Sequence, residues 1–140
     1  MKTVQLKKTT QTDWEYLSEK KLLQKPLVLV FGNRYMLEDA NLHSEICSLF
    51  PDGEFVFGST AGDITSQYVD DETISITAIE FEKSNYVIKT ANMLDNEAKK
   101  DSYETGKNLI QQFDTEGLKH VFIVFKAMAS RIFNCDVIVD

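Results

Sequence analysis

Two glycines, two hydroxyl residues and an acid form the segment of this chain best suited to bind a small molecule. Gly58-Ser59-Thr60-Ala61-Gly62-Asp63 follows directly after a short apolar strand, Glu54 to Phe57. Glycine permits backbone conformations that a Cβ forbids, and such a turn can point successive N–H groups toward an anion. Asp63 either caps a backbone group or contacts a cationic part of a ligand, such as the amine of an amino acid. The segment predicts a binding site and specifies no reaction.

A second loop with polar side chains follows the apolar run Leu27 to Phe31 and contains Asn33 and Arg34. If the strands before the two loops are parallel neighbours, both loops lie at the sheet edge where open α/β sheets bind ligands. Together they offer backbone N–H groups, hydroxyls, an amide and a guanidinium, which suit a carboxylate or phosphate. The competing interpretation is a structural turn in which Ser59 and Thr60 satisfy backbone groups.

Other kinds of chemistry fit the sequence less well. The glycine segment lacks the lysine of a phosphate loop and is not G-x-G-x-x-G. Ser59 is outside a G-x-S-x-G elbow, and neither His43 nor His120 has an evident orienting partner, so no catalytic residue is assigned. His43 and Cys47 could share a metal ion on one helix, but a site needs further ligands. Asp70-Asp71-Glu72 suits a solvated turn better than a cation site. No metal or cofactor is assigned.

Length, charge and cysteine content restrict the class of protein. The 140 residues suit one domain with a hydrophobic core. A net charge of -7 argues against nucleic acids and anionic membranes as partners. Two cysteines fit a reducing compartment, Met1 to Gln5 does not resemble a secretion signal, and the run Leu27 to Phe31 is too short to span a bilayer. We therefore expect a cytoplasmic protein.

Strand-like and helix-like segments alternate along the chain. The expected strands are Lys2 to Thr9, Leu27 to Phe31, Glu54 to Phe57, Thr73 to Phe81, Tyr86 to Thr90 and Val121 to Phe125. The expected helices run from Thr12, at a capping box, to Gln24, from Asp39 to Phe50, and from Asp101 to Phe113 with Gly117 as a C-cap.

The order of these elements predicts the architecture. Strand, helix, strand around Asp39 to Phe50 indicates a βαβ crossover with parallel neighbouring strands. A turn at Ser84-Asn85 predicts an antiparallel hairpin, and the long strand before it has a possible register break near Ala78-Ile79. The expected fold is α/β (α+β mixed), a layered mixed β-sheet with helices packed on it.

The segment Phe57 to Ile64 resembles the G-x-S-T-A-G-E-I signature of the FIST N-terminal domain family, with Asp63 where glutamate is usual. The strand after Pro26, the segment Asp71 to Phe81, the position of Gly106 and the run Val121 to Phe125 are also similar. The resemblance covers about residues 1–125. It implies a non-enzymatic sensory domain of signal-transduction proteins that binds small ligands, such as amino acids or other small carboxylates.

The end of the chain departs from the family pattern. Lys126 to Arg131 stands where the family has an acidic-glycine-leucine loop, and we expect the second half of the family architecture, the FIST C-terminal domain, to be absent. We therefore expect a single shortened domain, 1–140, with a divergent tail at 126–140. Such a shortened sheet would leave an edge or apolar face uncovered, which favours a homo-oligomer or a tail strand at Ile132 to Val139. The alternative function is a protein-interaction module that recruits a partner by strand addition.

Overall fold

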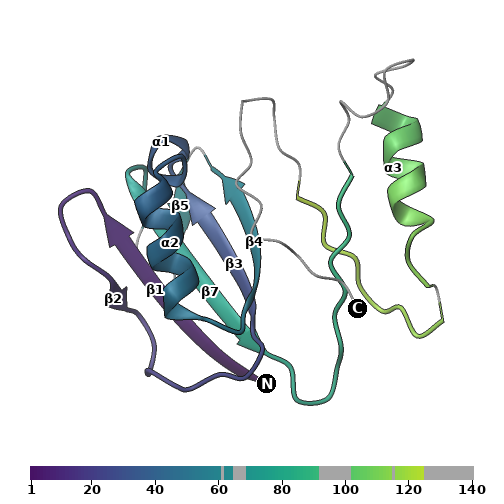
Figure 1. Cartoon of the computed structure of the whole chain (residues 1–140), viewed down its shortest axis with the longest axis horizontal. Helices are drawn as coiled ribbons and strands as arrows, with labels where there is room; N and C mark the ends of the chain where they lie inside the picture. Colours follow the sequence, from purple (N-terminus) through teal and green to yellow (C-terminus); the bar gives the residue numbers. More distant parts are fainter. Residues whose placement is uncertain (61, 65–68, 92–101, 115, 125–140) are drawn as a thin grey trace. The chain divides into compact units, whose positions relative to one another are not determined.

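The computed structural model describes residues 1–60, 62–64, 69–91, 102–114 and 116–124 (Figure 1). Of residues 63–64, 69–70 and 102 only the backbone is described. The described residues fall into two compact units. The first consists of residues 1–84 and 124, and the second of residues 85–123.

A five-stranded mixed sheet forms the centre of the first unit. Its strands lie in the order β2-β1-β7-β3-β4. The bounds are β1 Lys2–Thr9, β2 Glu15–Tyr16, β3 Leu27–Gly32, β4 Glu54–Ser59 and β7 Thr73–Glu80. β3 and β4 are parallel, and the other neighbouring pairs are antiparallel. Two short strands, β5 Asp63–Ile64 and β6 Val69–Asp70, pair with each other. The expected mixed α/β architecture is confirmed.

The predicted crossover connects β3 to β4. After β3 come α1 Arg34–Leu37 and α2 Ala40–Leu49, and β4 returns parallel to β3 (Figure 1). Asp39 caps α2 by accepting a hydrogen bond from the N–H of Asn41 at 2.9 Å, as a side-chain N-cap does. Leu42 and Ile46, one helical turn apart, are buried and belong to the core. The apolar stripe of the helix therefore packs against the core.

One face of the sheet carries most of the core, because alternate residues of a strand share a face. In the register, Val30 of β3 lies opposite Ile76 of β7, which lies opposite Leu6 of β1. All three side chains are completely buried. The core cluster consists of Val4, Leu6, Leu23, Val28, Val30, Leu42, Ile46, Phe50, Ile74, Ile76 and Ala78.

The opposite face of the sheet has a polar half and an apolar half. On β1 and β7, Gln5 Nε2 donates to Thr77 Oγ1 at 3.3 Å. On β1 and β2, Nζ of the buried Lys7 lies 3.7 Å from Oε2 of Glu15. On β3, Leu29 and Phe31 alternate with the core residues and are half-buried. β3 is an interior strand of the sheet, between β7 and β4, and its two faces are buried to different degrees.

The helix expected from Thr12 to Gln24 is wrong. The Thr12 hydroxyl lies 2.8 Å from that of Thr9, and the Thr12 N–H donates to Thr9 Oγ1, so this threonine closes a turn instead of capping a helix. Glu15–Tyr16 then pairs with β1 as β2. Pairing with a strand already in the sheet supplies the backbone hydrogen bonds that the capping-box pattern assigned to a helix.

Two expected strands are also absent from the described part of the chain. Residues 86–90 and 121–124 form no strand there, and Phe125 lies outside the described residues. Val121, Phe122 and Ile123 are exposed, so composition alone gave the wrong interpretation of this apolar run. The predicted hairpin is therefore wrong as well. β7 pairs with β1 at every position from Thr73 to Glu80, so the register break does not occur.

The second unit contains α3 Ser102–Ile110, which confirms the predicted helix over most of its length. The helix ends at Ile110, and Gly117 lies beyond it in a turn with φ +78°. Its proposed cap Asp101 lies outside the described residues, as does the tail at 126–140. Thr105 is the only residue of α3 with a described side chain that is buried.

Candidate functional site

The loops that follow β3 and β4 meet at one edge of the sheet, the one formed by the carboxyl ends of these two strands, as the parallel topology predicts. Gly32 and Ser59, the last residues of the two strands, lie opposite each other in the register. The N–H of Thr60 donates to the carbonyl of Gly32 at 3.0 Å and ties the two loops together. The N–H of Asn33 donates to the carbonyl of Thr73 at 2.9 Å, which brings the start of β7 to the same edge.

These hydrogen bonds change the chemistry expected at the edge. The N–H groups of Thr60 and Asn33 already donate within the protein, so they are not available to an anion. The predicted cup of outward-pointing backbone N–H groups is wrong at these two positions. Binding of an anion at this edge therefore cannot use these two backbone N–H groups.

Asn33 is the N-cap of α1. Its Oδ1 accepts hydrogen bonds from the N–H groups of Tyr35, at 2.9 Å, and Met36, at 3.4 Å. Its Nδ2 donates to the carbonyl of Asp71 at 3.3 Å. Both ends of the amide thus hold the loop after β3 against the loop before β7, which is a positioning role.

Arg34 forms an ion pair with Glu38 one helical turn later, with Nε 2.9 Å from Oε1. About half of each side chain is exposed, 49% for Arg34 and 44% for Glu38. The ion pair orients the guanidinium at the solvent surface. A guanidinium carries five N–H donors, so the single bond from Nε does not exhaust its capacity to bind a carboxylate.

Gly58 is a strand residue, and its role is different from the one predicted. It lies in β4 opposite Phe31, whose Cε1 is 2.7 Å from the position that a Cβ on Gly58 would occupy. The aromatic ring therefore takes the space of the missing side chain. Close packing, and not a left-handed turn, accounts for the glycine at this position.

Gly32 is the glycine that sequence reasoning did not select. A Cβ there would lie 2.3 Å from the carbonyl oxygen of Thr73 and 2.8 Å from Cα of Ile74. Its absence lets β7 approach the end of β3 closely enough for the bond between Asn33 and Thr73. A glycine that ends an apolar strand directly before an asparagine is the signal that could have pointed to it.

The structure describes the remaining residues of the predicted site to different extents. Ser59 is exposed at the end of β4, and Thr60 is half-buried. Gly62 lies in an exposed bend. The backbone of Asp63 pairs with Asp70 in the β5–β6 ribbon, and its side chain is outside the described part. Ala61 lies outside the described residues.

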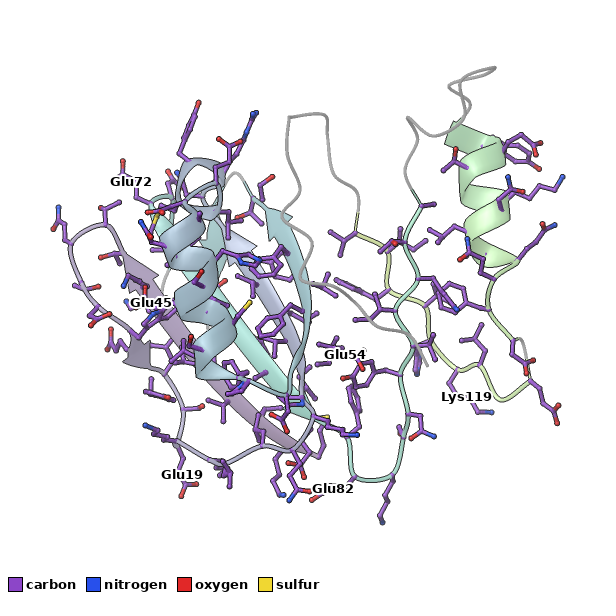
Figure 2. All side chains as sticks on the ribbon, viewed as in Figure 1. Glu19, Glu45, Glu54, Glu72, Glu82 and Lys119 are labelled. Carbon is purple, nitrogen blue, oxygen red and sulfur yellow. The ribbon has the colours of Figure 1, made fainter. Side chains whose placement is uncertain are left out.

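Acidic side chains surround this edge. Asp71 and Glu72 are exposed where β7 begins, and Figure 2 shows Glu72 and Glu82 near opposite ends of that strand. Glu38 adds a third carboxylate through its pair with Arg34. The mixture of one guanidinium with several carboxylates suits a ligand that carries an ammonium group beside its carboxylate, since each charge can find an opposite one.

The alternative candidates have a structural explanation. His43 stacks on Phe57 with ring centroids 5.0 Å apart, and its Nδ1 lies 4.0 Å from Cys47 Sγ. Within the described ranges, no three histidine, cysteine or acidic side chains come together as a metal site would require. No helix in the described part is long and apolar enough to cross a membrane.

Comparison with known protein families gives a match to the FIST N domain over residues 26–134. No curated protein and no solved structure gave a match. The matched range includes β3, the crossover, β4 and β7, and thus both loops of the candidate site. The chain therefore belongs to the FIST N domain family, whose members are sensory domains of signal transduction.

Proposed function

We propose that this sensory domain is non-enzymatic and binds a small carboxylate, such as an amino acid, at the joined ends of β3 and β4. The observation that carries the proposal is the hydrogen bond from the Thr60 N–H to the Gly32 carbonyl. It fixes the two loops side by side at the edge where open α/β sheets bind their ligands.

The side chains at this edge have separate roles in the proposed site. The guanidinium of Arg34 and the hydroxyls of Ser59 and Thr60 hold the carboxylate of the ligand. The exposed carboxylates of Asp71 and Glu72 attract its ammonium group. Asn33 contributes through the loop geometry, because its amide is used to cap α1 and to reach Asp71.

A thermal-shift screen of amino acids and organic acids tests this function. A ligand that binds only the native state raises the melting temperature. We expect the rise to be lost in Ser59→Ala and Thr60→Val and kept in Ser48→Ala, which removes an exposed hydroxyl of α2 that bonds to the Ser44 carbonyl. Absence of any hit, or hits that are the same in all three variants, would reject the site.

A second candidate function is protein interaction through the free side of β4. Among the described residues, β4 pairs with β3 on one side and with no strand on the other. It contains neither lysine nor proline, the residues that commonly protect an edge strand. The exposed run Val121, Phe122 and Ile123 adds apolar surface in the second unit. An edge strand of this kind can accept a strand from a partner protein or from a second copy of this chain.

Light scattering coupled to size-exclusion chromatography distinguishes the two functions. Association that rises with concentration and is abolished by Val56→Lys, within β4, supports the interaction module. Phe122→Lys is the matched variant in the second unit, and it tests in the same way whether the exposed run Val121, Phe122 and Ile123 takes part in the association. A monomer at all concentrations, together with a ligand hit at Ser59 and Thr60, supports the sensory site alone.

A further inference from the structure

The face of the central sheet that points away from the core carries a second apolar surface. In the register, Leu27 of β3 lies opposite Ile79 of β7, and Leu29 lies opposite Val56 of β4. Phe31 lies two residues further along β3 and therefore on the same face. We call the surface that these five residues form the outer apolar face: Leu27, Leu29, Phe31, Val56 and Ile79.

The helices of the first unit do not account for the outer apolar face. Its five side chains are half-buried and lie outside the core cluster, whereas Phe55 and Phe57 of β4 pack against that cluster. α1 packs Met36 and Leu37 against the core, and α2 lies on the same side. A parallel pair of strands joined by a crossover is normally covered on both faces. Among the described residues of the first unit, no helix is left to cover the outer apolar face.

A residue from far along the chain already lies against this face. Val124 Cγ1 is 3.3 Å from the position that a Cβ on Gly58 would occupy. Gly58 lies opposite Phe31, so this position is on the outer apolar face, beside the aromatic ring. Val124 belongs to the first unit, whereas residues 85–123 form the second. The residues that follow Val124 therefore start at the outer apolar face.

The sequence after Val124 has the pattern of an amphipathic helix. Residues 125–135 lie outside the described part of the chain, and the pattern is taken from the sequence. Apolar residues recur at the spacing of one helix face, namely Phe125, Met128, Ala129, Ile132 and Phe133. Lys126, Ser130 and Asn134 fall on the other side, and no glycine or proline interrupts the segment. The family match extends to residue 134, so the FIST N domain includes most of this segment.

We propose that residues 125–135 form a helix that packs Met128, Ile132 and Phe133 on the outer apolar face. The sheet then lies between helices on both sides, a common layered arrangement of α/β domains. The occupant is this chain's own segment, because Val124 leads it onto the face without a linker. The helix takes the place of the strand expected at Ile132 to Val139 over the residues that the two share.

Methyl NMR with a soluble paramagnetic gadolinium chelate tests whether the outer apolar face is covered. The chelate broadens the signals of methyl groups that solvent reaches. In the dilute wild-type protein, we expect the methyl signals of Leu29 and Val56 to be broadened much less than those of Leu22, which is 90% exposed. Broadening equal to that of Leu22 would show an open face and overturn the proposal. Protection that appears only at high protein concentration would assign the cover to a second copy and also overturn it.

Two variants with the same charge change identify the segment that covers the face. Ile132→Asp places a carboxylate on the apolar side of the proposed helix, and it should increase the broadening of the Leu29 and Val56 methyl signals severalfold. Asn134→Asp places a carboxylate on the polar side and should leave the broadening as in the wild type. An equal response to the two substitutions, or no response to either, would reject residues 125–135 as the occupant.

Nuclear Overhauser effects in the wild-type protein test the same contact without a substitution, in case Ile132→Asp fails to fold. We expect cross-peaks from the methyl groups of Met128 or Ile132 to those of Leu29 or Val56. A sample mixed from two differently labelled chains should show these cross-peaks within one chain. Their absence, or cross-peaks only between the two chains, would overturn the proposal.

Discussion

The ring of Phe31 lies over Gly58 on the neighbouring parallel strand. The two residues are opposite each other in the β3–β4 register, and Cε1 and Cδ1 of Phe31 lie 2.7 and 2.8 Å from the position of a Cβ on Gly58. Val124 Cγ1 lies 3.3 Å from that same position. The glycine therefore provides space for an aromatic side chain next to the candidate site.

Gly58→Ala should destabilise the protein by about 1–3 kcal/mol, the usual cost of overpacking a close contact. The added methyl group requires the ring of Phe31 to move, since 2.7 Å is shorter than any ordinary contact between carbon atoms. Urea unfolding followed by circular dichroism measures the change. Gly106→Ala is the control, because a Cβ there meets no atom within 4 Å, and it should be neutral or stabilising.

A double-mutant cycle with Phe31→Leu identifies the cause. Leucine removes the ring, so Gly58→Ala should cost less in the Phe31→Leu background than in the wild type. An equal cost in both backgrounds would show that the ring of Phe31 is not what requires the glycine.

Asn33→Ala should destabilise the protein by about 1–2 kcal/mol, because it removes the N-cap of α1. It also removes the bond to the Asp71 carbonyl. Asn33→Asp separates the two contributions, since the carboxylate still accepts from Tyr35 but no longer donates to Asp71. The unfolding free energies should follow the order wild type, Asn33→Asp, Asn33→Ala. A value for Asn33→Asp equal to that of Asn33→Ala would contradict the capping role.

The crossover could be predicted from the sequence because its determinants are local. An apolar run gives β3, Asp39 caps α2, and Leu42 and Ile46 recur at helical spacing. The structure of the segment after Thr12 could not be predicted from the sequence. It depends on pairing with β1 and on the contact between Thr9 and Thr12 that closes the turn. Sheet pairing between segments has no signature within either segment alone.

The candidate site was predictable in position but not in detail. Parallel strands place the loops after β3 and β4 together, whatever their sequences. The actual roles of Asn33 and Thr60 depend on hydrogen bonds to Asp71 and Gly32, which lie far away along the chain. The carbonyl groups of these partners can accept from any donor, so their residue types give no indication of the bonds.

Acid should destabilise the protein partly through Glu80. Its hydrogen bond with the Lys2 side chain, then the bond from the Gln24 N–H, holds the pKa of the Glu80 carboxyl below its ordinary value. A lowered folded-state pKa gives stability that is present above the unfolded-state pKa and lost as the pH falls through the folded-state pKa. Urea midpoints measured from neutral to acidic pH should therefore fall less steeply in Glu80→Gln than in the wild type.

The control for this pH dependence is Glu72→Gln, which removes an exposed acid near the other end of β7. Its midpoints should fall as steeply with pH as those of the wild type. Matching slopes in all three proteins would show that Glu80 does not contribute to the acid sensitivity, in spite of its contact with Lys2.

The change in stability caused by a substitution at Lys25, whose φ is +42°, should depend on how well the new residue tolerates positive φ and not on its charge. A residue with a Cβ in the left-handed region costs roughly 1–2 kcal/mol, least for asparagine, and a β-branched side chain increases the strain. Lys25→Gly relieves this strain but gains entropy in the unfolded chain, so its net effect should be within about 1 kcal/mol of zero. Lys25→Asn should also be tolerated, whereas Lys25→Val should be clearly destabilising. Urea unfolding of the three variants gives the order directly. If Lys25→Val is as stable as Lys25→Asn, the hydrogen bond to Asp52 does not hold this residue at positive φ in solution.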